Sequence, residues 1–389
     1  MSLTLSLPAE GGRPTRYTMR GTPVRVSPGP HKHSRVAFSA AHVVADPFSD
    51  TEPSGNAAID WDKTIAFRRH LLDLGLGIAE AMDTAQRGFG LDWKAALELI
   101  RRSLDAASES ERDRIFSGVG TDHLSPADTR TLDDVVRAYG EQIEAVQRVG
   151  GRMIFMASRA LARLATSADD YRYVYNKTIG MVEKPVILHW LGEMFDPALK
   201  GYWGADNFEE TLETALAVIH DNEAKIDGIK ISLLDAQKEV YMRRRLPSGV
   251  RMYTGDDFNY PELIKGDAQG YSHALLGIFD PIAIAASTAL AALARGDTAE
   301  YDRLMSPTVP LGRLIFRAPT RFYKTGVVFL AYLNGHQEHF VMLGGAQSMR
   351  PLPYFVDIFR LADAADLLEN PDQALGRMRS FLTMYGFEQ

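Results

Sequence analysis

The sequence of 389 residues contains no cysteine, which excludes disulfides, thiolate metal sites and thiol nucleophiles. It has no apolar run as long as a bilayer span, and its first residues lack the charged start and apolar core of a signal peptide. It also has no excess of positive charge, because it contains 43 Lys and Arg but 50 Asp and Glu, which gives a formal net charge of -7. We therefore expect a cytoplasmic protein that binds neither nucleic acid nor a membrane.

What is present is an ordinary globular composition, 46% hydrophobic and 24% charged, with room for a sizeable core. Residues 2 to 20 alternate apolar and polar around a Gly-Gly turn. This pattern predicts a β-hairpin within an N-terminal extension, residues 1–30. A neighbouring sheet edge or the base of the main domain is its expected packing surface.

Eight short β-rich runs alternate with helical stretches through residues 31–296. Eight strand-helix units in about 260 residues predict an α/β fold, a closed (β/α)8 TIM barrel. The rival is a doubly wound open sheet, but "GLGIAE" lacks the glycine fingerprint that would support it. The predicted strands lie within residues 35–44, 76–84, 114–122, 152–160, 185–192, 226–234, 250–257 and 270–276.

After residue 296 the strand pattern stops. The remaining segment reads as several helices broken by Pro-Leu-Pro and Gly-Gly turns. Residues 297–389 are therefore predicted to form a C-terminal helical domain. The preceding helix, "DPIAIAASTALAALARG", is apolar nearly all round and is expected to be covered on both sides.

The predicted sixth strand, "IDGIKISLL", contains a lysine among apolar residues. Strand alternation turns Ile229 and Ile231 to the helices, and Lys230 and Ser232 to the barrel interior. A buried ammonium is costly, so such a lysine either has a carboxylate partner or becomes a neutral amine. A neutral amine is the nucleophile that forms a Schiff base with a carbonyl compound.

The segments "GIKISLLD" and "MYTGDDFNYPELIKGDAQGYSHALLGIFDP" resemble those of the dihydrodipicolinate synthase and N-acetylneuraminate lyase family, the lysine-dependent aldolases. The resemblance runs from about residue 35 nearly to the C-terminus and marks a divergent branch. It implies a TIM barrel with a C-terminal helical domain, and it gives Lys230 the imine-forming role. Ser232, Thr254 and Asp256 are predicted to contact the substrate.

The predicted fifth strand departs from the family, which presents a tyrosine there as a proton relay. This chain has "VILHWLGEMF", with His189 at the matching place. An imidazole with an unperturbed pKa of about 6.5 suits general acid-base catalysis near neutrality. Alternation also turns His189 inward, so we predict that His189 is the proton relay.

The turn after the second strand departs as well. The family's Gly-Thr-Thr-Gly-Glu turn binds the carboxylate of a 2-oxo acid, whereas the matching residues here are "MDTAQ". Thr84 keeps the second threonine and Asp83 replaces the first, and both are predicted to contact the substrate. Because the Asp83 carboxylate would repel an anion, the substrate is expected to be either a keto acid neutralised by a nearby cation or a keto-sugar derivative.

Histidine and aspartate residues at the predicted strand ends also allow a metal-dependent mechanism. His42, Asp83, His123 and His189 all fall at or just beyond predicted strand ends, where barrel enzymes build their sites. They would either contact the substrate separately or hold a divalent metal that polarises a carbonyl. No tight ligand spacing is present, and "HQEH" at 336–339 has none either, so we predict neither a metal nor another cofactor.

The resulting prediction is a lyase, either an aldolase or a hydro-lyase, in which Lys230 forms a Schiff base with a small-molecule carbonyl substrate. Two alternatives remain open: a metal-dependent barrel lyase or isomerase, and a ligand-binding homologue without catalysis. The resemblance also implies a homodimer or homotetramer.

Overall fold

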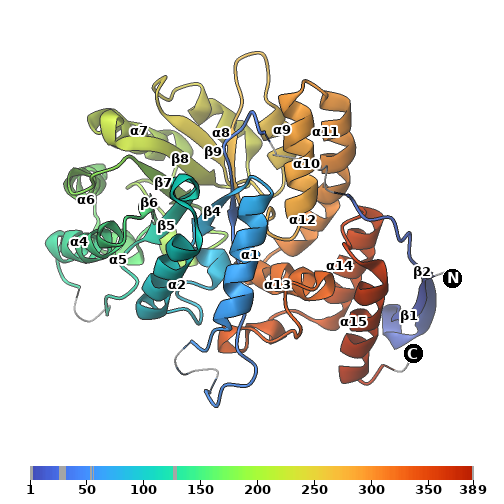
Figure 1. Ribbon diagram of the computed structural model, residues 1–389. Coiled ribbons are helices and arrows are strands. Elements are labelled where there is room, and N and C mark those ends of the chain that lie inside the picture. The colour runs from blue at the N-terminus through green and yellow to red at the C-terminus, as the bar shows by residue number, and fades with distance from the viewer. Residues whose placement is uncertain (1–2, 26–31, 53–54, 56, 126–128, 388–389) are drawn as a thin grey trace.

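The computed structural model describes residues 3–25, 32–52, 55, 57–125 and 129–387. Its strands form a two-stranded antiparallel sheet, β1-β2, and a closed parallel barrel in the order β10-β3-β4-β5-β6-β7-β8-β9 (Figure 1). The strands are β1 Thr4–Pro8, β2 Pro14–Thr18, β3 Ala37–Ala40, β4 Gly77–Glu80, β5 Ile115–Val119, β6 Arg152–Phe155, β7 Val186–Leu191, β8 Ile226–Ser232, β9 Arg251–Thr254 and β10 His273–Leu276.

The barrel confirms the predicted (β/α)8 fold and excludes the open sheet, because β10 pairs with β3 and closes the ring. Helices follow the strands around the outside, and more helices follow β10. They are α1 Trp61–Asp73, α2 Trp93–Ala106, α3 Glu109–Arg112, α4 Leu132–Arg148, α5 Arg159–Leu164, α6 Ala168–Gly180, α7 Phe208–Asp221, α8 Ala236–Arg243, α9 Tyr260–Lys265, α10 Ala283–Ala294, α11 Thr298–Met305, α12 Val309–Ile315, α13 Tyr323–Asn334, α14 Leu352–Ala364 and α15 Pro371–Met384.

The interior of the barrel is a packed core. Side chains from alternating strand positions fill it, as the pleat requires. They are separate from the larger apolar core between the strands and the helices. The interior cluster consists of Phe38, Ala40, Ala79, Met82, Phe116, Ile154, Ile187, Tyr253 and Leu275. A substrate site in the barrel is therefore expected above this packed core, at the strand ends.

The helices after β10 pack around α13, nearly all of whose residues are buried. Figure 1 shows α13 between the barrel and α14 and α15. Its first turn contacts the short 3-10 helix η2 (Asp83–Ala85), which follows strand β4. An element of the C-terminal region thus reaches the mouth of the barrel.

The N-terminal hairpin is confirmed, and it packs on the C-terminal helices, not on the base of the barrel. Strand β1 lies against α14 and α15, where Leu5 and Leu7 are buried. The Tyr17 hydroxyl donates to the Asp363 carboxylate of α14 at 2.8 Å. The alternating apolar side chains of β1 therefore cover the C-terminal helices.

Candidate active site

Lysine 230 lies in β8 and points into the barrel, as alternation predicts. Its neighbours in register are His189 of β7 and Tyr253 of β9. The side chain is only 8% exposed, and no carboxylate lies within ion-pair distance of its Nζ among the described residues. Burial lowers the pKa of Lys230, and the charges of Asp257 and Asp83 oppose this shift only in part.

A glycine makes room for this lysine. Gly255 directly follows β9, and its backbone N–H donates to the Ile231 carbonyl at 2.9 Å. A Cβ on Gly255 would lie 2.7 Å from Cε of Lys230 and 2.2 Å from Oγ of Ser232. The glycine of "TGDD" is therefore a packing requirement of the Lys230 side chain.

Histidine 189 also faces inward and is 2% exposed. Its Nε2 lies 3.2 Å from the Ser232 hydroxyl, while its Nδ1 is buried without a partner in the described part of the chain. Burial, with a smaller contribution from the charge of Lys230, lowers the pKa of His189 well below its ordinary value. The expected titration near neutrality is thus shifted downward, and the imidazole is neutral at physiological pH with one nitrogen free to accept a proton.

Aspartate 257 faces Lys230 as well. Its Oδ1 accepts from the backbone N–H of Ile278 at 2.8 Å. Burial raises the pKa of Asp257 to about 7, although the Lys230 charge acts in the opposite direction. Burial therefore drives both groups toward their uncharged forms, an amine and a carboxylic acid.

A tyrosine enters the site from helix α13. The Tyr323 hydroxyl lies 2.8 Å from the hydroxyl of Thr84, and the Tyr323 ring stacks on Phe316 with centroids 4.4 Å apart. Burial raises the pKa of Tyr323 well above its ordinary value. The phenol is therefore protonated and able to donate.

The next residue of α13 is a second buried lysine. Lys324 is 6% exposed, and its Nζ lies 5.5 Å from the ring centre of Phe89. Burial lowers the pKa of Lys324, while the nearby Asp83 carboxylate favours the charged form. Asp83 thus acts electrostatically on both buried lysines, Lys230 and Lys324.

These side chains enclose a cavity above the barrel core, which we name the inner chamber. Its free volume is only about 20 Å³, room for one water-sized molecule. Its polar walls come from both the barrel and α13. They are Asp83, Thr84, His189, Lys230, Ser232, Asp257 and Tyr323.

A second cavity of about 630 Å³, the outer chamber, shares Asp83, His189 and Leu191 with the inner one. Arg87 forms part of its wall but is held by Asp122 and Gln142. Arg159 also lines it and pairs with Asp196. The outer chamber has space for the larger part of a small molecule, while the inner chamber beside Lys230 has room for one water-sized group.

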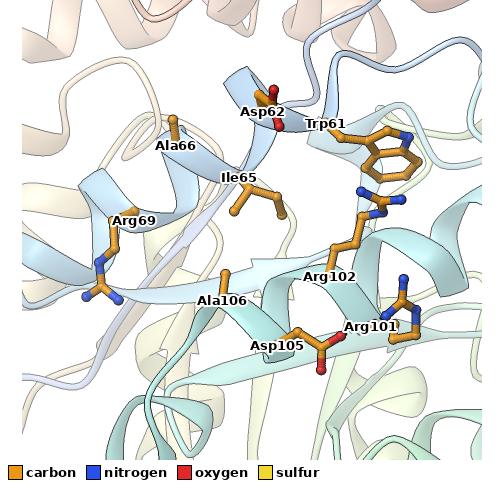
Figure 2. A pocket seen from close by; sticks show the side chains of 9 residues that line it. All are labelled: Trp61, Asp62, Ile65, Ala66, Arg69, Arg101, Arg102, Asp105 and Ala106. Atoms are coloured by element: carbon orange, nitrogen blue, oxygen red, sulfur yellow. Dashed lines mark hydrogen bonds and ion pairs between the residues drawn. The ribbon is translucent and has the colours of Figure 1, made fainter.

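A further groove of about 670 Å³ lies between α1 and α2, away from the strand ends (Figure 2). Its arginines are neutralised locally. Arg101 bonds to Glu98 and Asp105, and Arg102 covers the Trp61 ring at 4.5 Å. This groove is open and brings no reactive group together.

Four predicted substrate contacts do not line the inner chamber. Thr254 points outward and donates to Glu239 of α8 at 2.8 Å, because alternation turns its neighbour Tyr253 inward. Asp256 accepts from the backbone N–H groups of Phe258 and Asn259 and so shapes the turn.

The two predicted histidines are held elsewhere. His42 is fully buried, with Nδ1 2.8 Å from Asp280. The Nε2 atom of His123 lies 2.9 Å from the Glu141 carboxylate. Among the described residues, the ligand atoms of His42, Asp83, His123 and His189 form no group close enough for a metal.

Asp257, Tyr323 and Lys324 were not predicted. The sequence could have indicated Asp257, because it directly follows Asp256. However, the strand ends before Gly255, so strand alternation no longer predicts the direction of the Asp257 side chain. Tyr323 had no such indication, because its partner Thr84 is 239 residues away.

The chain belongs to the family described as "Protein of unknown function (DUF993)", whose model matches residues 5–387. No curated protein matches the sequence. Similar solved structures are dihydrodipicolinate synthases, which confirms the fold implied by the resemblance. The enzyme from Acinetobacter baumannii, complexed with pyruvate, has a TM-score of 0.64 at 17% identity, covering 86% of this chain and 99% of its own.

Two more synthases give the same result. The Bacillus anthracis structure has a TM-score of 0.62 at 16% identity and covers 84% of this chain and 97% of its own. The Thermotoga maritima structure has a TM-score of 0.59 at 13% identity, with 91% and 99% covered. In the described part of the chain, no helix is both long and apolar enough to cross a membrane.

Proposed function

We propose that this member of a family of unknown function is a Schiff-base lyase in which Lys230 is the nucleophile. The observation that carries the proposal is a lysine buried in β8, without an ion-pair partner among the described residues, at the end of a cavity that opens outward. Burial lowers its pKa and so favours the free amine that attacks a carbonyl. The pyruvate complex of the Acinetobacter baumannii enzyme supports a carbonyl ligand for this fold.

The first half of the reaction needs an amine and an acid. The Lys230 amine adds to the carbonyl carbon of the substrate, and the carbinolamine loses its oxygen as water after protonation. Asp257 supports this step, because a carboxyl with a pKa of about 7 is protonated in about half of the molecules at neutral pH and can donate that proton. The product is a protonated imine on Lys230.

The second half needs a base and a donor near the carbons beside the imine. The imine accepts the electron pair of a breaking carbon-carbon bond, or of a carbon-hydrogen bond whose proton is removed, which gives an enamine. His189 accepts and returns the proton, and the Tyr323 hydroxyl bonded to Thr84 is a second donor. Water then hydrolyses the imine and frees Lys230.

The substrate is a ketone or 2-oxo compound with a small reacting end. Two carboxyl groups, Asp83 and Asp257, line the inner chamber, and Lys230 is the only lysine among the described residues of its wall. This charge pattern favours hydroxyl groups over a carboxylate beside the reacting carbon, as in a keto-sugar derivative. The remaining polar part would lie in the outer chamber. A homodimer or homotetramer and a cytoplasmic location remain predictions.

Borohydride trapping tests the function. The full chain is incubated with 2-oxo acids, aldoses or keto-sugars and reduced with borohydride, and the intact mass of the protein is measured. In parallel, the turnover of the same compounds is followed. A substrate that is both consumed and trapped as a stable amine adduct supports the proposal. Saturable binding without turnover identifies a binding protein instead, and chelator-sensitive turnover without an adduct identifies a metal-dependent enzyme; either result contradicts it.

A further inference from the structure

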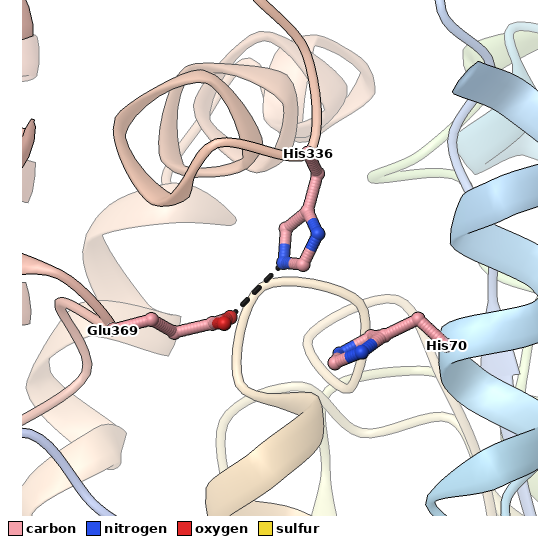
Figure 3. A group of neighbouring side chains, drawn as sticks. All are labelled: His70, His336 and Glu369. Carbon is pink, nitrogen blue, oxygen red and sulfur yellow. Dashed lines mark hydrogen bonds and ion pairs between the residues drawn. The ribbon is translucent and has the colours of Figure 1, made fainter.

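Three side chains outside the lining of the inner chamber converge where the barrel meets the C-terminal helices (Figure 3). They are His70 of α1, His336 just after α13, and Glu369 between α14 and α15. One ligand atom of each lies within 4.8 Å of the other two. In the described part of the chain this is the one group of three or more such residues close enough for a metal ion.

We propose that His70, His336 and Glu369 bind a divalent transition-metal ion, Zn²⁺ by preference, as a clamp between the barrel and the C-terminal helices. Two imidazoles and one carboxylate with an open fourth position for water are a ligand set that Zn²⁺ accepts. The site is separate from the strand-end histidines and from the lyase chemistry. It therefore goes beyond the proposed function.

The contacts within the group leave a ligand atom unused. The Nε2 atom of His336 lies 3.0 Å from Glu369, close to the spacing of two atoms on one ion. The Nε2 atom of His70 is buried and has no partner among the described residues. A buried nitrogen without a hydrogen bond is unfavourable, and a metal would satisfy it.

The distances need only a small adjustment. Two bonds of about 2.1 Å at a tetrahedral ion place their ligand atoms about 3.4 Å apart. The rings of His70 and His336 already face each other, with centroids 4.9 Å apart at 46°. A side-chain rotation of His70 closes the remaining gap, because the separation is at most 4.8 Å.

The backbone around two of the ligands is fixed. Gly335 ends α13 in the left-handed conformation at φ 88°, and the N–H of His336 donates to the Ala331 carbonyl at 3.0 Å. The Asn334 side chain accepts from the N–H of Glu369 at 3.1 Å. The two loops are thus tied to each other before any ion binds.

The surroundings favour a cation. The carboxylates of Asp73 and Asp280 add negative potential at the His70 ring, in addition to Glu369. Phe67 packs against both imidazoles, with centroids 5.8 Å from His70 and 4.9 Å from His336. The side chains of His336 and Glu369 remain 18% and 30% exposed, so an ion has access.

The test uses the tag-free full chain, stripped with chelator and titrated with Zn²⁺ by calorimetry and with Co²⁺ by visible absorption. We expect one equivalent bound, a higher melting temperature with Zn²⁺, and the intense visible bands of four- or five-coordinate Co²⁺. His70→Gln and Glu369→Gln should each weaken binding at least about 100-fold, since loss of a supporting partner alone costs 10- to 100-fold. His220→Gln, an exposed histidine on α7, is the matched control and should bind as the wild type does.

Absence of a bound equivalent, or equal affinity in wild type and both variants, overturns the proposal and leaves an ordinary His336–Glu369 ion pair. The Glu369→Gln variant decides the question if His70→Gln does not fold. Lyase activity is not a readout, so failure here leaves the proposed function untouched.

Discussion

The hydroxyl of Tyr323 lies 2.8 Å from the hydroxyl of Thr84, which joins the first turn of α13 to η2, the 3-10 helix that follows strand β4. The C-terminal helices thereby supply a phenol to a barrel whose strand β7 carries His189, at the place where the resemblance to dihydrodipicolinate synthases leads us to expect a tyrosine. Two groups that we propose for proton transfer line the inner chamber, His189 from the barrel and Tyr323 from α13.

Tyr323→Phe removes this hydroxyl and keeps the ring stacked on Phe316. We expect kcat to fall by about 10²- to 10⁴-fold, the range of a lost acid-base group, while borohydride still traps the imine. Tyr354→Phe is the matched control, because its hydroxyl donates to the Ile315 carbonyl and does not line the inner chamber. Unchanged turnover in Tyr323→Phe would show that the phenol takes no part in proton transfer.

Gly255→Ala places a methyl group against Lys230 and Ser232. With contacts of 2.7 and 2.2 Å, the lysine must move, and a displacement of about 1 Å costs about 10²-fold in rate. We expect slower adduct formation and a loss of about 1–3 kcal/mol in stability from overpacking. Gly249→Ala, whose nearest contact would be 3.9 Å, should have neither effect. Normal adduct formation in Gly255→Ala would mean that the lysine position is not critical.

Asp257→Asn tests the electrostatics of the nucleophile. The Asp257 charge raises the pKa of Lys230 and so opposes the effect of burial. Without that charge the pKa of Lys230 falls further, so the acid limb of the trapping rate should move to lower pH. The measurement is the rate of adduct formation from pH 5 to 9, with the exposed Glu209→Gln on α7 as the control. An acid limb that stays in place or moves to higher pH contradicts the assignment.

Glu239→Gln tests a stability effect outside the chamber. Burial raises the pKa of Glu239 from 4.5 to about 8, while Thr254 and Ser272 donate to its carboxylate. Between these two values the unfolded chain has lost the proton that the folded protein keeps, so this group lowers stability as pH rises. At 1.36 kcal/mol per pKa unit the full loss is roughly 5 kcal/mol, an upper bound.

The glutamine variant removes that proton uptake. Its free energy of unfolding relative to wild type should therefore increase by a few kcal/mol from pH 5 to pH 8, as measured by urea denaturation. Glu209→Gln, an exposed side chain on α7, should show no such trend. Parallel pH curves for wild type and Glu239→Gln would refute the raised pKa.

The features that the sequence predicted well are those governed by local periodicity. The eight barrel strands were found because each β run is short and precedes a helical stretch. The directions of Lys230, Ser232 and His189 followed from strand alternation, which holds within β7 and β8. The same rule places Thr254 on the outer side, next to an inward Tyr253, and its side chain does not line the inner chamber.

The features that could not be predicted depend on contacts between distant segments. Tyr323 reaches Thr84 only because α13 packs against η2. The pKa of His189 lies well below its ordinary value because the finished fold buries the ring, and the residue type alone does not reveal this burial. His70, His336 and Glu369 show no ligand spacing in the sequence, since each comes from a different element.

The central claim is that Lys230, and not another lysine, forms the imine. The most direct measurement is peptide mapping of the borohydride-reduced adduct in wild type and in Lys230→Arg, which keeps a positive charge but has no amine nucleophile. We predict an adduct on the peptide that contains Lys230, and neither adduct nor turnover in Lys230→Arg. An adduct on another residue, such as Lys324, or full turnover by Lys230→Arg would contradict the account.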